Sequence, residues 1–128
     1  MKKRARRQVE CTIPVLPVGS LARSIRFYTE KLEFKLDWRG GALCSVSRDG
    51  SSIMLRQKHR RDKSAPVWVW IGLESDTLFE KFRARGVKVL QEPRNCSWAY
   101  EMMFADPDGN VLWLGTESKR NLPLEENG

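Results

Sequence analysis

Large apolar residues recur at every second position just before a proline-containing turn near the end of the chain. Over residues 99–105, Tyr100, Met102 and Phe104 fall on one side and the residues between them on the other. This period is typical of a β-strand with two different faces. Residues 106–109, Asp-Pro-Asp-Gly, suit a type I turn, and the apolar run 111–114 suits a buried strand. The pattern therefore predicts a hairpin that closes the domain.

The first half of the chain shows the order strand, helix, strand, strand, strand. Ser20 is a typical helix N-cap, and apolar residues recur after it at helical spacing, at Leu21, Ile25, Tyr28 and Leu32. Strands are predicted at residues 11–18, 34–38, 42–46 and 52–57. The last two are joined across Asp49-Gly50, which is a strong hairpin signal.

The same order of elements then repeats. A strand is predicted at 67–73, a helix carries Leu78, Phe79 and Phe82 and ends at Gly86, and a strand at 87–91 precedes the closing hairpin. Position 13 matches position 68 at a spacing of 55 residues, and the two Asp-Gly turns match at a spacing of 59. We interpret this as an internal duplication of a β-α-β-β-β unit.

Length and composition indicate one domain of 128 residues. We expect a basic tail at 1–8, a domain at 9–117 with modules 9–57 and 66–117, a polar linker around 58–64, and a loose polar tail at 118–128. No apolar run approaches the ~18 residues of a membrane span, and no apolar segment of a signal peptide follows the basic start. Three cysteines without a CxxC spacing indicate reduced thiols and a cytoplasmic protein.

The positive net charge is concentrated at the start of the chain. The net charge is +7, and five positive residues stand at positions 2, 3, 4, 6 and 7, so residues 8–128 carry only +2. Such a tail can attract nucleic acid by non-specific phosphate contacts. We expect instead that this tail and the basic loop at 58–63 are simply solvated, and that nucleic acid is not a partner.

The segments 13–34, 67–75 and 101–114, together with the repeat, resemble the vicinal oxygen chelate superfamily, which includes glyoxalase I, extradiol dioxygenases and bleomycin-resistance proteins. The resemblance covers nearly the whole chain outside the two tails. It implies an α+β fold in which two βαβββ modules form a cupped mixed sheet around a pocket. It also implies a homodimer.

The resemblance also implies where a metal would be bound. The metal enzymes of this superfamily hold a divalent ion at positions that fall here on Ile13, Trp68 and Trp113. Ile has no donor atom, and an indole N–H donates a hydrogen bond without accepting one. The only histidine, His59, lies in the basic loop. We therefore expect no metal and no cofactor.

Without a metal, the chain most resembles the bleomycin-resistance branch, which binds and sequesters an antibiotic. In that branch a flat heteroaromatic group lies between aromatic rings of two subunits, at places that map onto Trp38 and Trp98. We expect these two to stack on the ligand and Trp68 and Trp113 to form an apolar floor. The remaining expected ligand contacts are Met54, Tyr100, Met102 and Glu101. The alternative is that these tryptophans are core residues and ordinary dimer contacts.

Two further alternatives concern charge and chemistry. Bleomycin-type drugs are cationic, whereas Arg39 follows Trp38 directly, so a neutral or anionic aromatic ligand also fits the sequence. A superfamily enzyme of the lyase or dioxygenase type, with a non-standard metal site, is the alternative function. In a metal-free enzyme Glu101 would be a general base; otherwise it forms a salt bridge, for which Arg56 is a candidate.

Overall fold

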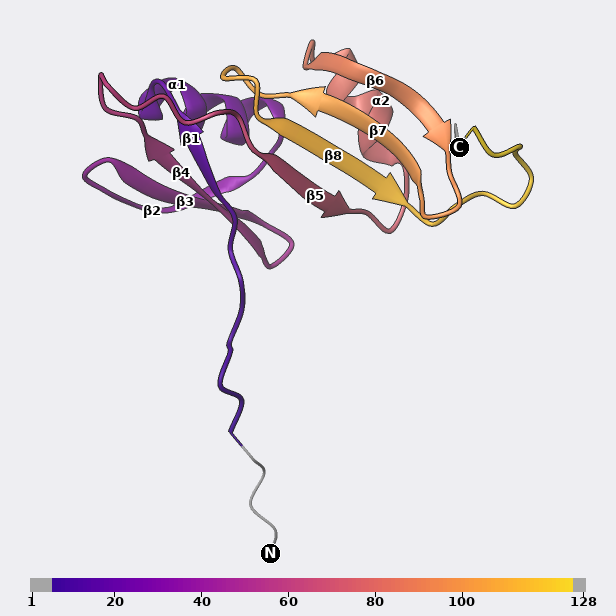
Figure 1. Cartoon of the computed structure of the whole chain (residues 1–128), viewed down its shortest axis with the longest axis horizontal. Coiled ribbons are helices and arrows are strands. Elements are labelled where there is room, and N and C mark those ends of the chain that lie inside the picture. Colours follow the sequence, from indigo (N-terminus) through magenta and orange to yellow (C-terminus); the bar gives the residue numbers. More distant parts are fainter. Residues whose placement is uncertain (1–5, 126–128) are drawn as a thin grey trace, which may run out of the picture.

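The computed structural model describes residues 6–125, which form two four-stranded sheets and their helices (Figure 1). The strand order is β1-β4-β3-β2 in the first sheet and β5-β8-β7-β6 in the second. The elements are β1 (Val15–Val18), α1 (Leu21–Arg26), the π-helix η1 (Phe27–Lys31), β2 (Lys35–Gly40), β3 (Leu43–Arg48), β4 (Ser51–Gln57), β5 (Trp68–Gly72), α2 (Thr77–Ala84), β6 (Lys88–Asn95), β7 (Tyr100–Ala105) and β8 (Val111–Thr116). The α+β fold of two βαβββ modules is therefore confirmed.

The two modules are equivalent down to the register of their strands. Val15 on β1 lies opposite Met54 on β4. Trp70, 55 positions after Val15, lies opposite Trp113, 59 positions after Met54. Both pairs are parallel, and both spacings are those of the sequence repeat. The duplication is thus present in the hydrogen-bonded register as well as in the order of elements.

Local signals account for most element boundaries. The Ser20 side chain caps α1 by accepting from the backbone N of Arg23 at 3.2 Å, as predicted. Asp49 and Gly50 both have positive φ, 50° and 78°, which is the backbone that a tight hairpin between β3 and β4 requires.

Two boundaries differ most from those predicted. The strand predicted at 87–91 continues to Asn95, because a register shift between Gln91 and Arg94 accommodates Pro93 within it. The strand predicted at 11–18 begins only at Val15. The carbonyl oxygen of Pro14 still accepts from the backbone N of Met54 at 2.9 Å, and the described residues at the start of the chain run away from the body of the protein (Figure 1).

Each helix covers one face of its sheet. Phe82 on α2 meets Phe104 on β7 edge to face, with ring centroids 5.8 Å apart, and Phe79 stacks on Tyr100 at 5.6 Å. In the first module the fully buried Tyr28 packs against Phe34. The opposite face of each sheet, which no helix covers, is called the open face below. It carries the site.

The turn at 106–110 fastens the second module to the first. Tyr28 donates its hydroxyl to Asp106 Oδ2 at 2.9 Å, and Asn110 Nδ2 donates to the carbonyl oxygen of Pro17 at 2.9 Å. Asp108 Oδ1 accepts from the backbone N of Gly19 at 2.9 Å. Asp106 and Asn110 are buried, so these bonds are protected from water. The conspicuous Asp-Pro-Asp-Gly-Asn sequence therefore serves to join the modules.

The two chain ends need separate statements. Of the expected basic tail, residues 1–5 lie outside the described residues, as do residues 126–128 of the expected C-terminal tail. The described part of the second tail is not loose: residues 118–125 pack against Asn95 at the end of β6. No helix within residues 6–125 is long and apolar enough to cross a membrane.

Candidate functional site

Three tryptophans form a contiguous row on the open face of the second sheet. Trp68 and Trp70 alternate with Val69 and Ile71 along β5, so both indoles point away from α2. Trp113 lies opposite Trp70 on β8. The Trp113 ring meets Trp70 at 4.9 Å and Trp68 at 6.0 Å between centroids, both edge to face. We call these three residues the tryptophan row.

The tryptophan row is exposed, which is unusual for residues of this size. Trp68 is 60% exposed and Trp70 46% exposed. Trp113 lies between them and is partly buried; its indole Nε1 is shielded from solvent, with no hydrogen-bond partner among the described residues. A cluster of aromatic rings that stays accessible on a sheet face is typical of a binding surface.

Two glycines allow the Trp70 ring to lie flat on the sheet. A Cβ added to Gly115 would stand 2.2 Å from Cη2 of Trp70, and one added to Gly72 would stand 3.2 Å from its Nε1. Gly115 and Gly72 are register neighbours on β8 and β5. Because neither has a side chain, the indole occupies the space that their side chains would fill.

A buried carboxylate borders this row. Glu101 lies opposite Gly115 on β7 and is only 2% exposed. It accepts from Trp98 Nε1 at 2.5 Å and from Gln91 Nε2 at 3.0 Å. No ion pair to Glu101 occurs within residues 6–125, so its charge is met only by these two neutral donors. The expected salt bridge with Arg56 is absent.

Arg56 has a different partner. Its guanidinium donates to Asp62 Oδ2 at 2.7 Å. Hydrogen bonds from Ser64 and Arg56 hold the pKa of Asp62 well below its usual range. The basic loop therefore folds back on the end of β4, and Arg56 is not available to neutralise Glu101.

Trp98 stands at the tip of the turn between β6 and β7. The turn is closed by Cys96 and Ala99, whose backbone groups bond each other at 2.8 and 3.3 Å. Trp98 is 58% exposed, and its bond to Glu101 directs the indole towards the end of the tryptophan row. The structure thus brings Trp98, Glu101 and the tryptophan row together.

Trp38 lies elsewhere. It is on β2, the edge strand of the first sheet, and is 44% exposed. A register shift at Asp37 places Trp38 opposite Ser45, in the same cross-strand row as Met54 and Val15. The strand β2 and the turn between β6 and β7 lie at opposite ends of the molecule (Figure 1). One chain therefore does not bring Trp38 and Trp98 together.

Two expected contact residues face the wrong side of the sheet. Tyr100 stacks on Phe79 of α2, and Met102 is fully buried in the core. Both share the helix-covered face of β7 because they alternate with Glu101 and Met103. Trp70 and Met103 lie on the open face instead, and Met103 stands opposite Trp113 there. The alternation of Trp68 and Trp70 with Val69 and Ile71 is the sequence signal that places Trp70 on this face.

A metal ion does not fit the residues present. The side chains of Ile13, Trp68 and Trp113 have no atom with a lone pair that could bind a metal ion. No group of three or more His, Cys, Asp or Glu side chains gathers within residues 6–125. Cysteine chemistry is not favoured either: Cys44 and Cys96 are fully buried, and burial raises the pKa of the Cys44 thiol. The open face of the second sheet is equipped for binding by aromatic contact.

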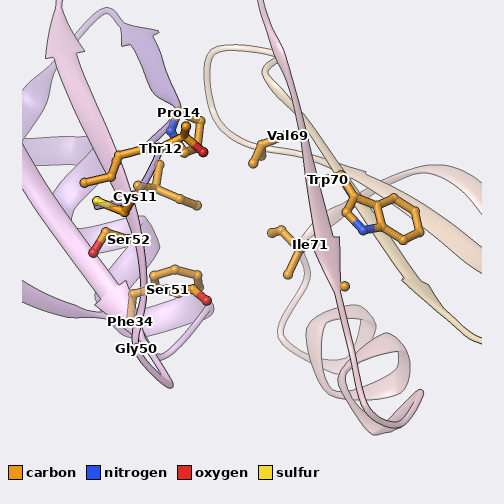
Figure 2. A pocket seen from close by; sticks show the side chains of 13 residues that line it. Cys11, Thr12, Pro14, Phe34, Gly50, Ser51, Ser52, Val69, Trp70 and Ile71 are labelled. Carbon is orange, nitrogen blue, oxygen red and sulfur yellow. The ribbon is translucent and has the colours of Figure 1, made fainter. Parts of the chain in front are cut away.

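A separate cavity of about 420 Å³ lies between the modules, beside the free edge of β5. In Figure 2, Val69 and Ile71 point towards this space, and Trp70 points to the opposite side of the strand. Trp70 contributes to the lining of the cavity, but its indole and the rest of the tryptophan row face the other side of β5.

Solved structures with a similar fold carry related descriptions. A bleomycin resistance determinant encoded on the transposon Tn5 is 18% identical, with a TM-score of 0.75, and the match covers 85% of this chain and 98% of that one. TnmS3, an antibiotic-binding protein from a Streptomyces species, is 24% identical with a TM-score of 0.72, covering 88% and 100%. A glyoxalase/bleomycin resistance protein/dioxygenase from Nocardioides is 22% identical with a TM-score of 0.70, covering 98% and 93%. At these identities the likeness establishes the fold.

A search of curated proteins found no match to this chain. The family comparison is decisive on its own, because it spans most of the sequence. Residues 9–114, from the segment before β1 to β8, match the profile of one family. The chain belongs to the Glyoxalase/Bleomycin resistance protein/Dioxygenase superfamily.

Proposed function

We propose that this protein binds and sequesters a flat aromatic small molecule without a metal ion. The observation that carries the proposal is the tryptophan row, three indoles held edge to face on a sheet surface that no helix covers. Stacking on such a ring adds about 0.5–1.5 kcal/mol per contact beyond the burial of apolar area. A sequestering protein needs no chemistry, since it lowers the free ligand concentration by mass action.

A second wall for the ligand comes from a second copy of the chain. Trp38 and Trp98 are both about half exposed but lie at opposite ends of one protomer. In a two-fold homodimer, Trp38 of one protomer meets the open face that carries the partner's Trp98. Each dimer then contains two equivalent sites. The proposed ligand contacts are Trp38, Trp68, Trp70, Trp98, Met103 and Trp113, with Met54 in the same cross-strand row as Trp38, two strands away.

Charge restricts the ligand further. Glu101 is a buried carboxylate without an ion-pair partner in the described chain, next to Trp98 and close to the Trp70 ring. It favours a ligand whose aromatic system carries a positive group. A bleomycin-type antibiotic has this combination, and one protein of similar fold, TnmS3, is an antibiotic-binding protein. We therefore choose bleomycin as the first probe and antibiotic resistance as the proposed role.

The test is a titration of metal-stripped protein with metal-free bleomycin, followed by tryptophan fluorescence and by calorimetry. We expect saturable binding with two ligands per dimer, weakened at least tenfold in Trp70→Ala and Trp98→Ala. Leu90→Ala is the matched control, because Leu90 is 46% exposed on β6 and lies outside the proposed contacts. Equal affinity in all four proteins would refute the proposed surface.

The alternative is a superfamily enzyme with a non-standard or absent metal site, and Glu101 is the observation that favours the metal-free form. A buried carboxylate beside a binding surface has the position that a general base needs. This alternative predicts that the purified protein carries a stoichiometric metal or converts a bound aromatic compound, as mass spectrometry would detect. Unchanged ligand recovered from the complex supports sequestration.

A further inference from the structure

The chain continues past the last strand, and residues 118–125 run from the end of β8 across to the end of β6 (Figure 1). Asn95, the last residue of β6, is 1% exposed and holds this segment with its side-chain amide. Its Nδ2 donates to the carbonyl oxygens of Lys119 at 2.9 Å and Leu122 at 3.1 Å. Its Oδ1 accepts from the backbone N of Lys119 at 2.8 Å. We call residues 118–125 the C-terminal strap.

The strap is fixed at both of its ends. At its start, Lys119 Nζ lies 3.2 Å from Asp76 Oδ2 and 4.9 Å from the centroid of the Tyr100 ring. At its end, Glu125 donates its backbone N to the Asn95 carbonyl oxygen at 2.7 Å. Its own carbonyl oxygen accepts from Arg94 at 3.0 Å. The strap backbone satisfies both the NH₂ group and the oxygen of the buried Asn95 amide. Only this path of the chain provides these bonds.

The residue that the strap grips stands directly before the turn that carries Trp98. Only Ser97 and Trp98 lie between Cys96 and Ala99, whose mutual backbone bonds close the turn. Because the turn is this short and is closed by two backbone bonds, its direction follows that of the end of β6. The Trp98 indole can reach Glu101 only while that direction is kept.

We propose that the C-terminal strap is a working part of the ligand site, in which Asn95 is a positioning residue that holds the Trp98 turn against the open face. The proposal rests on the proposed function in one respect, that Trp98 contacts the ligand. The other part of the proposal, that the strap immobilises Trp98, does not depend on the ligand. A site whose aromatic wall is held in place before binding loses less entropy on binding.

The test compares the intact protein with two shortened chains and one full-length variant, by NMR of the indole N–H groups. One chain ends after Glu125 and keeps all strap contacts, one ends after Glu117 and lacks the strap, and the third is Asn95→Ala. Trp98→Phe assigns the Trp98 indole signal. We expect the signal to shift and its ¹⁵N heteronuclear NOE to fall by at least half in the chain ending at 117 and in Asn95→Ala. The chain ending at 125 should match the intact protein, and the Trp70 and Trp113 signals should not move.

Bleomycin binding gives the second readout. We expect affinity about five- to tenfold weaker without the strap, the size of effect expected when one large side chain must be ordered on binding. If the intact protein does not bind bleomycin, the proposed ligand fails while the NMR comparison still decides the role of the strap. An unchanged Trp98 signal in the chain ending at 117 overturns the inference. Unfolding of both variants also overturns it, because the strap would then be required for the fold itself.

Discussion

The indole of Trp70 lies flat over Gly115, so close that a methyl group at position 115 would stand 2.2 Å from its Cη2 atom. Gly115 is on β8 and lies opposite Glu101 on β7. The absence of one side chain therefore sets the position of the ring and the shape of the surface between the tryptophan row and Glu101.

Gly115→Ala should displace the Trp70 ring. We expect a loss of about 1–3 kcal/mol in the free energy of unfolding, the usual effect of overpacking, together with weaker ligand binding. Urea unfolding measures the stability, near-UV circular dichroism reports the displacement of the Trp70 ring, and the bleomycin titration measures the affinity. Gly40→Ala is the control: nothing lies within 4 Å of an added Cβ there, so stability should not fall and should rise by up to about 1 kcal/mol. Equal behaviour of the two variants would contradict the close approach of Trp70.

Asp106→Asn should loosen the junction between the modules. Asp106 Oδ2 accepts from both Tyr28 and Asn110, and an amide NH₂ in that place would face two donors. Leaving these buried groups unpaired should cost about 2–4 kcal/mol of unfolding free energy, measured by urea denaturation. Asp49→Asn, in the exposed equivalent turn, is the matched control and should change stability by less than about 0.5 kcal/mol.

Tyr28 should make stability depend on alkaline pH. Burial, with the charge of Asp106 beside it, raises the pKa of Tyr28 well above 10.0. A raised pKa means that the unfolded chain loses this proton first, so the stabilising contribution is complete below pH 10.0 and is lost as pH rises towards the folded pKa. Unfolding measured between pH 8 and 11 should show a steeper loss for the intact protein than for Tyr28→Phe. Parallel curves would rule out this linkage.

Glu101→Gln should separate the effect of the hydrogen bonds that Glu101 accepts from the effect of its negative charge on ligand binding. A glutamine offers one acceptor oxygen to two donors, Trp98 and Gln91, so we expect a loss of about 1–3 kcal/mol in unfolding free energy. A cationic ligand should also bind more weakly, while a neutral aromatic analogue should bind with nearly unchanged affinity. Calorimetry with both ligands measures this. Glu74→Gln, on the exposed residue Glu74, controls for the general change in charge.

Local patterns in the sequence predicted most of the helices and strands, and the part of the site that lies on β5. The Ser20 cap, the Asp49-Gly50 turn and the period of two along β7 each depend on neighbours a few residues away, as does the alternation of Trp68 and Trp70 with Val69 and Ile71 along β5. The same period assigned Trp68 to the open face, where the structure has it. It would also have excluded Met102 and Tyr100, because they alternate with Glu101, which was expected in the same site.

The amino-acid sequence by itself determined the duplicated βαβββ order, the family and the lack of metal donors at positions 13, 68 and 113, because each of these is written in residue types and their spacing. Only the tertiary structure decided that Trp70 lies over Gly115, that Arg56 pairs with Asp62 instead of Glu101, and that Trp38 and Trp98 stand at opposite ends of one chain. The grip of Asn95 on residues 118–125 joins positions more than 20 residues apart. Such contacts depend on how whole strands are placed against one another, and the pattern within a strand carries no information about that placement.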